Sequence, residues 1–158
     1  MKFNKSIRNL LLVLFATFAL SACSTAKKSG STSGDVYTGK ETVKYLAKGV
    51  ADRVFFATNK STLTTASRAT LRKQADYLRK NKNLKVVIEG HADERGTREY
   101  NLALGEKRAN AAKDYLMTYG ISGKRISVIS YGKEKPVNSA STTLAWSQNR
   151  RSVTVKVK

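Results

Sequence analysis

The sequence predicts an α+β domain: a two-layer sandwich with helices on one face of a four-stranded mixed sheet, in the order β-α-β-α-β-β. Two long segments repeat apolar residues at helical spacing between short apolar runs, which favours helical crossovers between the early strands. The last segment alternates apolar and polar residues strictly, as a half-exposed strand does. A chain of 158 residues has room for one such domain with appendages.

The first strand and helix are predicted between residues 54 and 78. Residues 54–56 (Val-Phe-Phe) are a short apolar run of the kind found in buried strands. Residues 63–78 favour a helix, because Leu71, Ala75 and Leu78 recur on one helical face.

The middle of the domain is predicted to run strand, loop, helix. Residues 85–90 (Lys-Val-Val-Ile-Glu-Gly) indicate a second strand, and the polar residues 91–98 indicate a loop. A long helix follows over residues 100–119. Its predicted buried stripe consists of Leu102, Gly105, Ala109, Ala112 and Leu116. Gly120 ends the helix, because glycine readily adopts the left-handed conformation found there.

Two further strands are predicted over residues 125–130 and 152–157. The segment between them, 132–149, is rich in Ser and Thr, holds the single proline and shows no regular period. Residues 41–50 lead into the domain as either a short helix or a strand, and the pattern does not decide between the two.

The first 22 residues are typical of a secretory signal peptide. Lys2, Lys5 and Arg8 precede an apolar stretch that is too short for a comfortable membrane span. Residues 20–23 (Leu-Ser-Ala-Cys) resemble the lipobox of bacterial lipoproteins, in which the cysteine is acylated and becomes the new N-terminus. We therefore expect a covalent lipid on Cys23, which is the only cysteine, and no other cofactor. The alternative is an ordinary signal peptide with an incidental cysteine nearby.

The remaining chain divides into a tether and a domain. Residues 24–40 are dominated by Ser, Thr, Gly and Lys, which is typical of a flexible linker. We expect a lipidated N-terminus and tether over 23–50 and a folded domain over 51–158. The lipoprotein resemblance also implies that Ser24, where an Asp would retain the protein on the inner membrane, favours the periplasmic face of the outer membrane.

Composition excludes several classes of site. One Cys rules out an intrachain disulfide, and one His rules out any centre that needs several imidazoles. Lys and Arg number 30 against 11 Asp and Glu, a formal charge of +19. The basic residues are scattered along the domain, which indicates a positive surface that favours anionic neighbours such as cell-wall polymers or lipids. Secretion argues against nucleic acid as a partner.

The segment richest in candidate functional residues is 89–101, which runs from a strand end into the start of a helix. Gly90 and Gly96 permit tight turns there, and Asp93 lies between them. Unpaired helix N–H groups and the helix dipole suit anionic or zwitterionic ligands at such a junction.

The motifs of this region resemble the OmpA-like peptidoglycan-binding domain, and most fully its lipid-anchored branch. The matching pieces are residues 90–93 (Gly-His-Ala-Asp), Gly96, residues 100–101 (Tyr-Asn) and residues 104–109 (Leu-Gly-Glu-Lys-Arg-Ala), with support from 54–56, 130–136 and 149–153. The resemblance covers residues 52–156. The fold it implies is the same sandwich that periodicity predicts.

The resemblance implies non-covalent binding of peptidoglycan stem peptides through meso-diaminopimelate. Asp93 would take the ammonium of that residue, and Arg108 would hold its carboxylate with a planar guanidinium. Asn101 would assist through its amide. This clasp requires that Asp93 and Arg108 face one solvent-accessible position.

The resemblance also implies a tether between outer membrane and cell wall, and a partner, the TolB-type periplasmic propeller protein of a Tol-Pal type system. One departure concerns the loop after the first strand, where the family carries an Asp. This chain has Thr58 and Asn59 there, so the site keeps one formal carboxylate. We expect either a modest loss of affinity or a compensating backbone contact.

Two alternatives are a hydrolase acting on the cell wall and a lipoprotein that binds anionic polymers generally. His91 beside Asp93 and Glu94 suggests an enzyme. A catalytic zinc, however, needs about three protein ligands, commonly with histidine among them, and this chain has one histidine. A nucleophilic serine is also not indicated, because no Gly-x-Ser-x-Gly elbow occurs. We interpret His91 as a structural residue at the strand end and expect a binding protein, not an enzyme.

Overall fold

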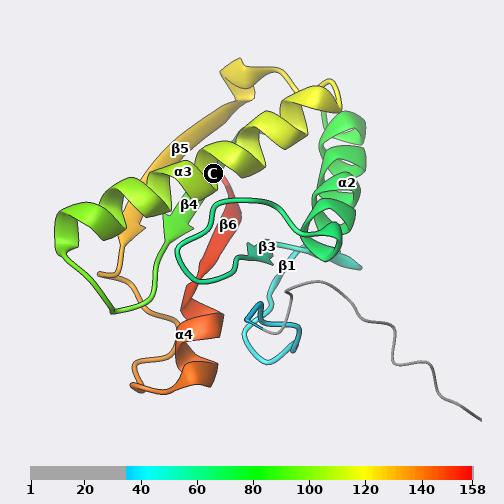
Figure 1. The fold of residues 1–158 in the computed structure, drawn as a ribbon. Helices are drawn as coiled ribbons and strands as arrows, with labels where there is room; N and C mark the ends of the chain where they lie inside the picture. The colour runs from blue at the N-terminus through cyan, green and yellow to red at the C-terminus, as the bar shows by residue number, and fades with distance from the viewer. Residues whose placement is uncertain (1–34, 158) are drawn as a thin grey trace, which may run out of the picture. The chain divides into compact units, whose positions relative to one another are not determined.

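The structure, a computed structural model, describes residues 35–157 (Figure 1). The predicted signal peptide, Cys23 and residues 24–34 of the predicted tether lie outside the described residues. The elements are β1 (Tyr45–Ala47), β2 (Val50–Ala51), β3 (Arg53–Phe55), α2 (Thr65–Lys80), β4 (Val86–His91), α3 (Arg98–Thr118), the 3-10 turn η1 (Gly123–Arg125), β5 (Ile126–Gly132), α4 (Thr143–Asn149) and β6 (Arg151–Lys156).

The central sheet has the strand order β3-β6-β4-β5. β6 runs antiparallel to both β3 and β4, whereas β4 and β5 are parallel. The predicted four-stranded mixed sheet is therefore confirmed. Because β3 and β4 both run opposite to β6, their C-terminal ends lie at the end of the sheet where β6 begins.

The two long helices pack against each other and against the sheet, with α3 lying along β4 and β5 (Figure 1). A threonine caps the N-terminus of each helix: the hydroxyl of Thr64 or Thr97 accepts an N–H of the first turn. The core buries the predicted faces of both helices with one difference in α3. The predicted Leu102 is only half-buried, and Leu104 is buried in its place. The core cluster consists of Val54, Phe56, Leu71, Ala75, Leu78, Val86, Ile88, Ala109, Ala112, Leu116, Ile121 and Ile126.

The chain before β3 is more ordered than the sequence predicts. Residues 45–51 form the hairpin β1–β2, which settles the undecided segment in favour of strands. Leu46 is buried, and Tyr37 packs edge-on against Phe55 with 4.8 Å between the ring centroids. Residues 35–50, which we expected to belong to the tether, therefore pack against the domain.

The predicted irregular connection between the last two strands contains a short helix, α4. Thr142 caps it by accepting the Ala145 N–H, and Ala145 is fully buried. Seven residues are too few to show a helical period in the sequence, so tertiary contacts rather than patterning stabilise this helix. Among residues 35–157, no helix combines the length and apolar character of a membrane span.

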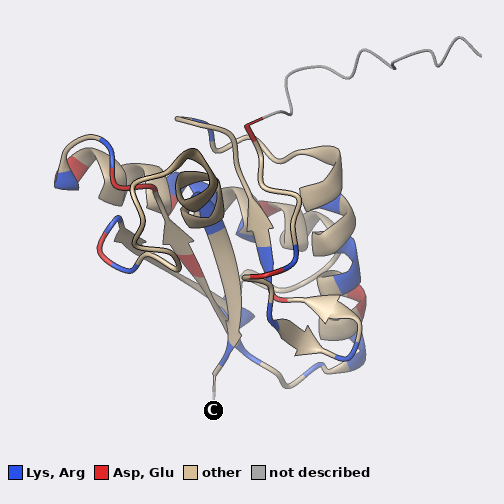
Figure 2. Ribbon diagram, turned by 90° about the horizontal axis from the view of Figure 1, so that it is seen from below, with Lys and Arg blue, Asp and Glu red and all other residues tan. Residues whose placement is uncertain are grey.

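The basic residues divide into an exposed and a buried group. Figure 2 shows Lys and Arg distributed over several elements and not gathered in one groove. Arg53, Arg108, Arg150 and Arg151 are instead buried. The predicted positive surface therefore does not include Arg108, Arg150 or Arg151, because their guanidinium groups donate to oxygen atoms inside the domain.

Candidate functional site

The candidate site lies where three segments meet at one end of the sheet. Residues 57–60 follow β3, residues 92–97 join β4 to α3, and Arg150 precedes β6. The antiparallel register pairs Phe55 with Arg151, and Gly90 with Ser152. The loops that follow β3 and β4 are thereby brought next to the start of β6.

Asp93 supplies the negative charge of the site and is 7% exposed. Its carboxylate accepts hydrogen bonds from Arg95 Nε at 3.0 Å and Arg95 Nη2 at 2.8 Å. Burial by itself would raise the pKa of Asp93, but the hydrogen bonds and charge of Arg95, with a hydrogen bond from Arg150, outweigh it and hold the pKa below the ordinary value. Asp93 is therefore ionised at neutral pH.

Arg150 supplies a second positive charge beside Asp93, and unlike Arg95 it is buried. Its guanidinium is almost completely buried and reaches three groups. Nη1 donates to Asp93 Oδ2 at 3.3 Å, Nε donates to the Phe56 carbonyl at 3.1 Å, and Nη2 donates to Asp35 Oδ1 at 2.6 Å. Arg150 thus connects the end of β3, the loop after β4 and the start of the described chain.

Arg108 lies on the interior side of the site and is fully buried. It donates to three backbone carbonyls: Nε to Lys60 at 2.9 Å, Nη1 to His91 at 2.9 Å and Nη2 to Ala57 at 3.1 Å. Burial, followed by the charge of Arg150, lowers the pKa of Arg108 to about 10, which still leaves it charged at neutral pH. Arg108 therefore fastens the loop after β3 to the end of β4.

The remaining predicted site residues shape the two loops. The Thr58 N–H donates to Asp35 Oδ2 at 2.5 Å, and the Thr58 hydroxyl accepts from Arg95 at 3.4 Å. Asn59 is exposed and has a positive φ of 54°, a conformation that asparagine tolerates better than most residues. Asn101 is buried and its amide donates to the Arg95 and Thr97 carbonyls, which ties the loop to α3.

The structure brings Asp93, Arg108, Asn101, Thr58 and Asn59 into one region, but not in the arrangement that we expected. The predicted clasp needs Asp93 and Arg108 to face one accessible position, whereas both side chains are buried and have other partners. The cations next to Asp93 are Arg95, two positions further along the chain, and the buried Arg150. Sequence reasoning missed the position of Arg150 because residue 150 becomes a neighbour of residue 93 only through the pairing of β6 with β4.

Glu94 and Trp146 lie at the rim of the site. Trp146 Nε1 donates to Glu94 Oε1 at 2.8 Å, and the Arg95 guanidinium lies 4.3 Å from the Trp146 ring centroid. The hydrogen bond from Trp146, followed by that from Ser141, lowers the pKa of Glu94. Because the pKa values of Asp93 and Glu94 are both lowered, neither carboxyl has the raised pKa typical of a general acid at neutral pH.

His91 is 2% exposed and packs near Tyr131, with 5.5 Å between ring centroids. Burial, followed by the charges of Arg151, Arg53 and Lys135, lowers its pKa to about 3, so the imidazole is neutral at physiological pH. Its position at the end of β4 fits the structural interpretation. Within residues 35–157, no three side chains of His, Cys, Asp or Glu come together in an arrangement that could hold a metal ion.

The fold and the loop motifs match one family of proteins. Residues 55–150 match the OmpA family. The chain superimposes on the crystal structure of the peptidoglycan-associated lipoprotein from Burkholderia pseudomallei with a TM-score of 0.65 and 38% identity, covering 67% of this chain and 90% of that one. The C-terminal domain of Helicobacter pylori MotB has the same fold, with a TM-score of 0.63, 18% identity and coverage of 68% and 84%.

Sequence similarity extends over most of the chain. A peptidoglycan-associated lipoprotein of Rhizobium meliloti (strain 1021) is 44% identical over 153 residues, covering 92% of this chain and 86% of the relative. One from Pasteurella multocida (strain Pm70) is 37% identical, covering 94% and 97%. The chain belongs to the OmpA family, in the branch of the peptidoglycan-associated lipoproteins.

Proposed function

We propose that this protein binds peptidoglycan non-covalently and joins the outer membrane to the cell wall. The observation that carries the proposal is an ionised carboxylate, Asp93, held 3.3 Å from the buried guanidinium of Arg150 between two loops. The relatives that resemble this chain over nine tenths of its length are named for their association with peptidoglycan. The ligand is a stem peptide recognised through diaminopimelate, whose free end carries an ammonium and a carboxylate.

Each end of that zwitterion has a complementary partner in the site. Asp93 receives the ammonium in place of Arg95, whose half-exposed guanidinium holds both carboxylate oxygens when no ligand is bound. Arg150 Nη2 together with the Thr58 N–H receives the carboxylate, because an arginine N–H and a backbone N–H are both strong donors to an anion. Arg108 adds positive charge from beneath and holds the two loops at a fixed separation. Asn101 keeps the loop of residues 95–97 in place, and Asn59 presents an uncharged amide at the rim.

The protein reaches the wall from a membrane anchor. Cys23 carries the lipid, the anchor lies on the periplasmic face of the outer membrane, and a TolB-type propeller protein competes with the wall for the domain. Two or more acyl chains give stable anchoring where one does not. A single site with a few charged hydrogen bonds binds weakly, but anchoring next to a polymer of repeated sites raises the effective concentration. Replacing Cys23→Ser should move the protein from the membrane fraction to the soluble fraction.

Co-sedimentation of the full-length protein with purified sacculi tests the proposed site. Asp93→Asn should weaken binding at least tenfold, since a hydrogen bond to a charged group contributes about 1.5–3 kcal/mol. Arg150→Lys should also weaken it. The matched control is Asp76→Asn, which removes one negative charge from an exposed pair on α2 and should bind normally.

The outcomes separate the candidate functions. Normal sedimentation of both site variants would reject the site, and failure of the wild-type protein to sediment would reject the function. Release of soluble fragments from the sacculi would identify a hydrolase. A binder of anionic polymers in general would lose affinity in high salt and would retain it in Asp93→Asn.

A further inference from the structure

The carboxylate position of the proposed site is occupied by part of the chain itself. Asp35 Oδ1 accepts from Arg150 Nη2 at 2.6 Å, and Asp35 Oδ2 accepts from the Thr58 N–H at 2.5 Å. The Asp35 backbone carbonyl also accepts from Arg150 Nη2. These are the two donors to which the proposed function assigns the ligand carboxylate, and Asp35 lies 115 positions before Arg150.

The charge balance of the site explains why Asp35 lies there. Arg150 is almost completely buried, and Asp93 neutralises one side of it at 3.3 Å. Without Asp35, Arg150 Nη2 and the Thr58 N–H would both need another acceptor, and a buried donor without one is costly. Burial by itself would raise the pKa of Asp35, yet the hydrogen bonds from Thr58 and the charge of Arg150 hold it below the ordinary value. Asp35 therefore acts as an anion at neutral pH.

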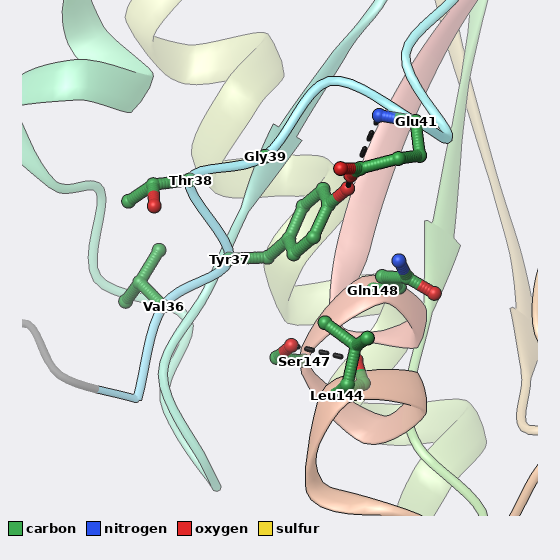
Figure 3. A pocket seen from close by; sticks show the side chains of 8 residues that line it. All are labelled: Val36, Tyr37, Thr38, Gly39, Glu41, Leu144, Ser147 and Gln148. Atoms are coloured by element: carbon green, nitrogen blue, oxygen red, sulfur yellow. Dashed lines mark hydrogen bonds between the residues drawn. The ribbon is translucent and has the colours of Figure 1, made fainter.

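The segment that carries Asp35 is attached to the domain through Asp35 and through the buried ring of Tyr37. Residues 35–41, which we call the plug segment, contain no helix or strand. Tyr37 anchors the segment on Phe55, and its hydroxyl donates to Glu41 within the segment. Figure 3 shows the plug segment facing α4 across a pocket lined by Val36, Tyr37, Thr38, Gly39, Glu41, Leu144, Ser147 and Gln148.

A ligand carboxylate can displace Asp35 without leaving a hydrogen-bond donor unpaired. The Asp35 side chain is 41% exposed, so a second carboxylate can approach the donors from solvent. An incoming carboxylate would replace Asp35 on the same two donors and leave neither unpaired. The exchange would cost the contacts of the segment with the domain, among them the packing of Tyr37 on Phe55.

We propose that the plug segment is an intramolecular competitor, in which the Asp35 carboxylate occupies the ligand's carboxylate position until a stem peptide displaces it. This inference rests on the proposed function and adds a regulatory element to the same site. Any event that draws residues 35–41 away from the domain opens the site. The domain binds the stem peptide more weakly while the plug segment is in place than after residues 35–41 have been pulled away from it.

The test compares the affinities of full-length variants for a soluble stem-peptide fragment containing meso-diaminopimelate, measured by calorimetry. Asp35→Ala should bind about tenfold more tightly if the segment occupies the site nine tenths of the time, because apparent affinity scales with the open fraction. Asp76→Asn changes the net charge equally on α2 and should bind as the wild type does.

A second measurement follows the segment in the wild-type protein. The Glu41 N–H donates to Tyr37 Oη at 3.2 Å, and the Tyr37 ring is held in place by its packing on Phe55. Hydrogen exchange at Glu41 therefore reports whether Tyr37 and its segment are docked. Saturation with the stem-peptide fragment should accelerate exchange over residues 36–41. If the wild-type protein binds the fragment but Asp35→Ala binds it no more tightly, the plug proposal fails and the proposed function stands. The same holds if the wild-type protein binds while hydrogen exchange over residues 36–41 is unchanged. No binding by either protein would overturn both.

Discussion

Three arginines in this domain use their guanidinium groups as internal connectors. Arg108 joins the carbonyls of Ala57, Lys60 and His91, and Arg150 joins Phe56, Asp93 and Asp35. Arg151 donates to the Asn149 and Lys135 carbonyls. A planar group with five N–H donors can satisfy several acceptors in different directions, which a lysine ammonium does with poorer geometry. The guanidinium groups of these residues therefore serve the interior of the domain, where their acceptors lie.

Arg108→Lys tests this connecting role at the residue scale. A lysine cannot reach all three carbonyls, so one or two buried acceptors should lose their partner, at roughly 1–3 kcal/mol each. We expect the free energy of unfolding, measured by urea titration, to fall by about 3 kcal/mol, with weaker sedimentation on sacculi. Arg79→Lys on the exposed side of α2 should change stability by less than about 0.5 kcal/mol. Unchanged stability with lost binding would instead mean that Arg108 contacts the ligand directly.

The position of α3 on the sheet depends on two glycines that face each other. A Cβ built on Gly90 would lie 1.8 Å from the Gly105 carbonyl oxygen, and one on Gly105 would lie 2.3 Å from Ser130 Oγ. α3 therefore approaches β4 and β5 more closely than any side chain would allow. This contact also sets the distance between Arg108 and the loops that it fastens, because Arg108 lies one turn after Gly105.

Gly105→Ala should push α3 away from β4, since its Cβ would meet backbone as well as the Ser130 hydroxyl. We expect a destabilisation of about 1–3 kcal/mol, the usual cost of overpacking, despite the higher helix propensity of alanine. Thermal or urea unfolding measures it. Glu106→Ala, at the next and exposed position of the same helix, should leave stability nearly unchanged. Equal stabilities of the two variants would show that the helix can shift without cost.

In the folded molecule, charged side chains from several strands of the sheet surround His91. Arg53 comes from β3, Arg151 from β6, and Glu89 lies 3.6 Å away on the same strand. Lys135 contributes from the connection after β5. Burial among these cations keeps the imidazole neutral in the folded state, whereas the unfolded chain would protonate it at an ordinary pKa of 6.5.

The pH dependence of unfolding follows from that difference. Because the folded pKa of about 3 lies below 6.5, the stabilisation is complete above pH 6.5 and is lost as the pH falls toward 3. Between pH 8 and pH 4 this amounts to roughly 3 kcal/mol. We expect His91→Gln to lose correspondingly less stability over this range in urea titrations at several pH values. Parallel curves for the two proteins would mean that His91 is accessible to protons in the folded state.

The two long helices, the four strands of the central sheet and the place of Asp93 at a junction of strand and helix could be predicted from the sequence. These features depend on periodicity and on residues close together in the chain, which a single sequence displays directly. It did not display α4, whose seven residues are too short for a period, or the hairpin before β3.

Which charges become neighbours could not be predicted from the sequence, because it depends on how distant segments pack. Arg150 reaches Asp93 because β6 pairs with both β3 and β4, and Asp35 reaches Arg150 across 115 residues. The burial of Arg108 likewise depends on tertiary contacts, since its carbonyl partners lie 17 to 51 positions away, at the end of β4 and in the loop after β3. The physical reason is that a side chain's charge is local information, whereas its burial and its partners depend on the order in which distant strands and helices pack.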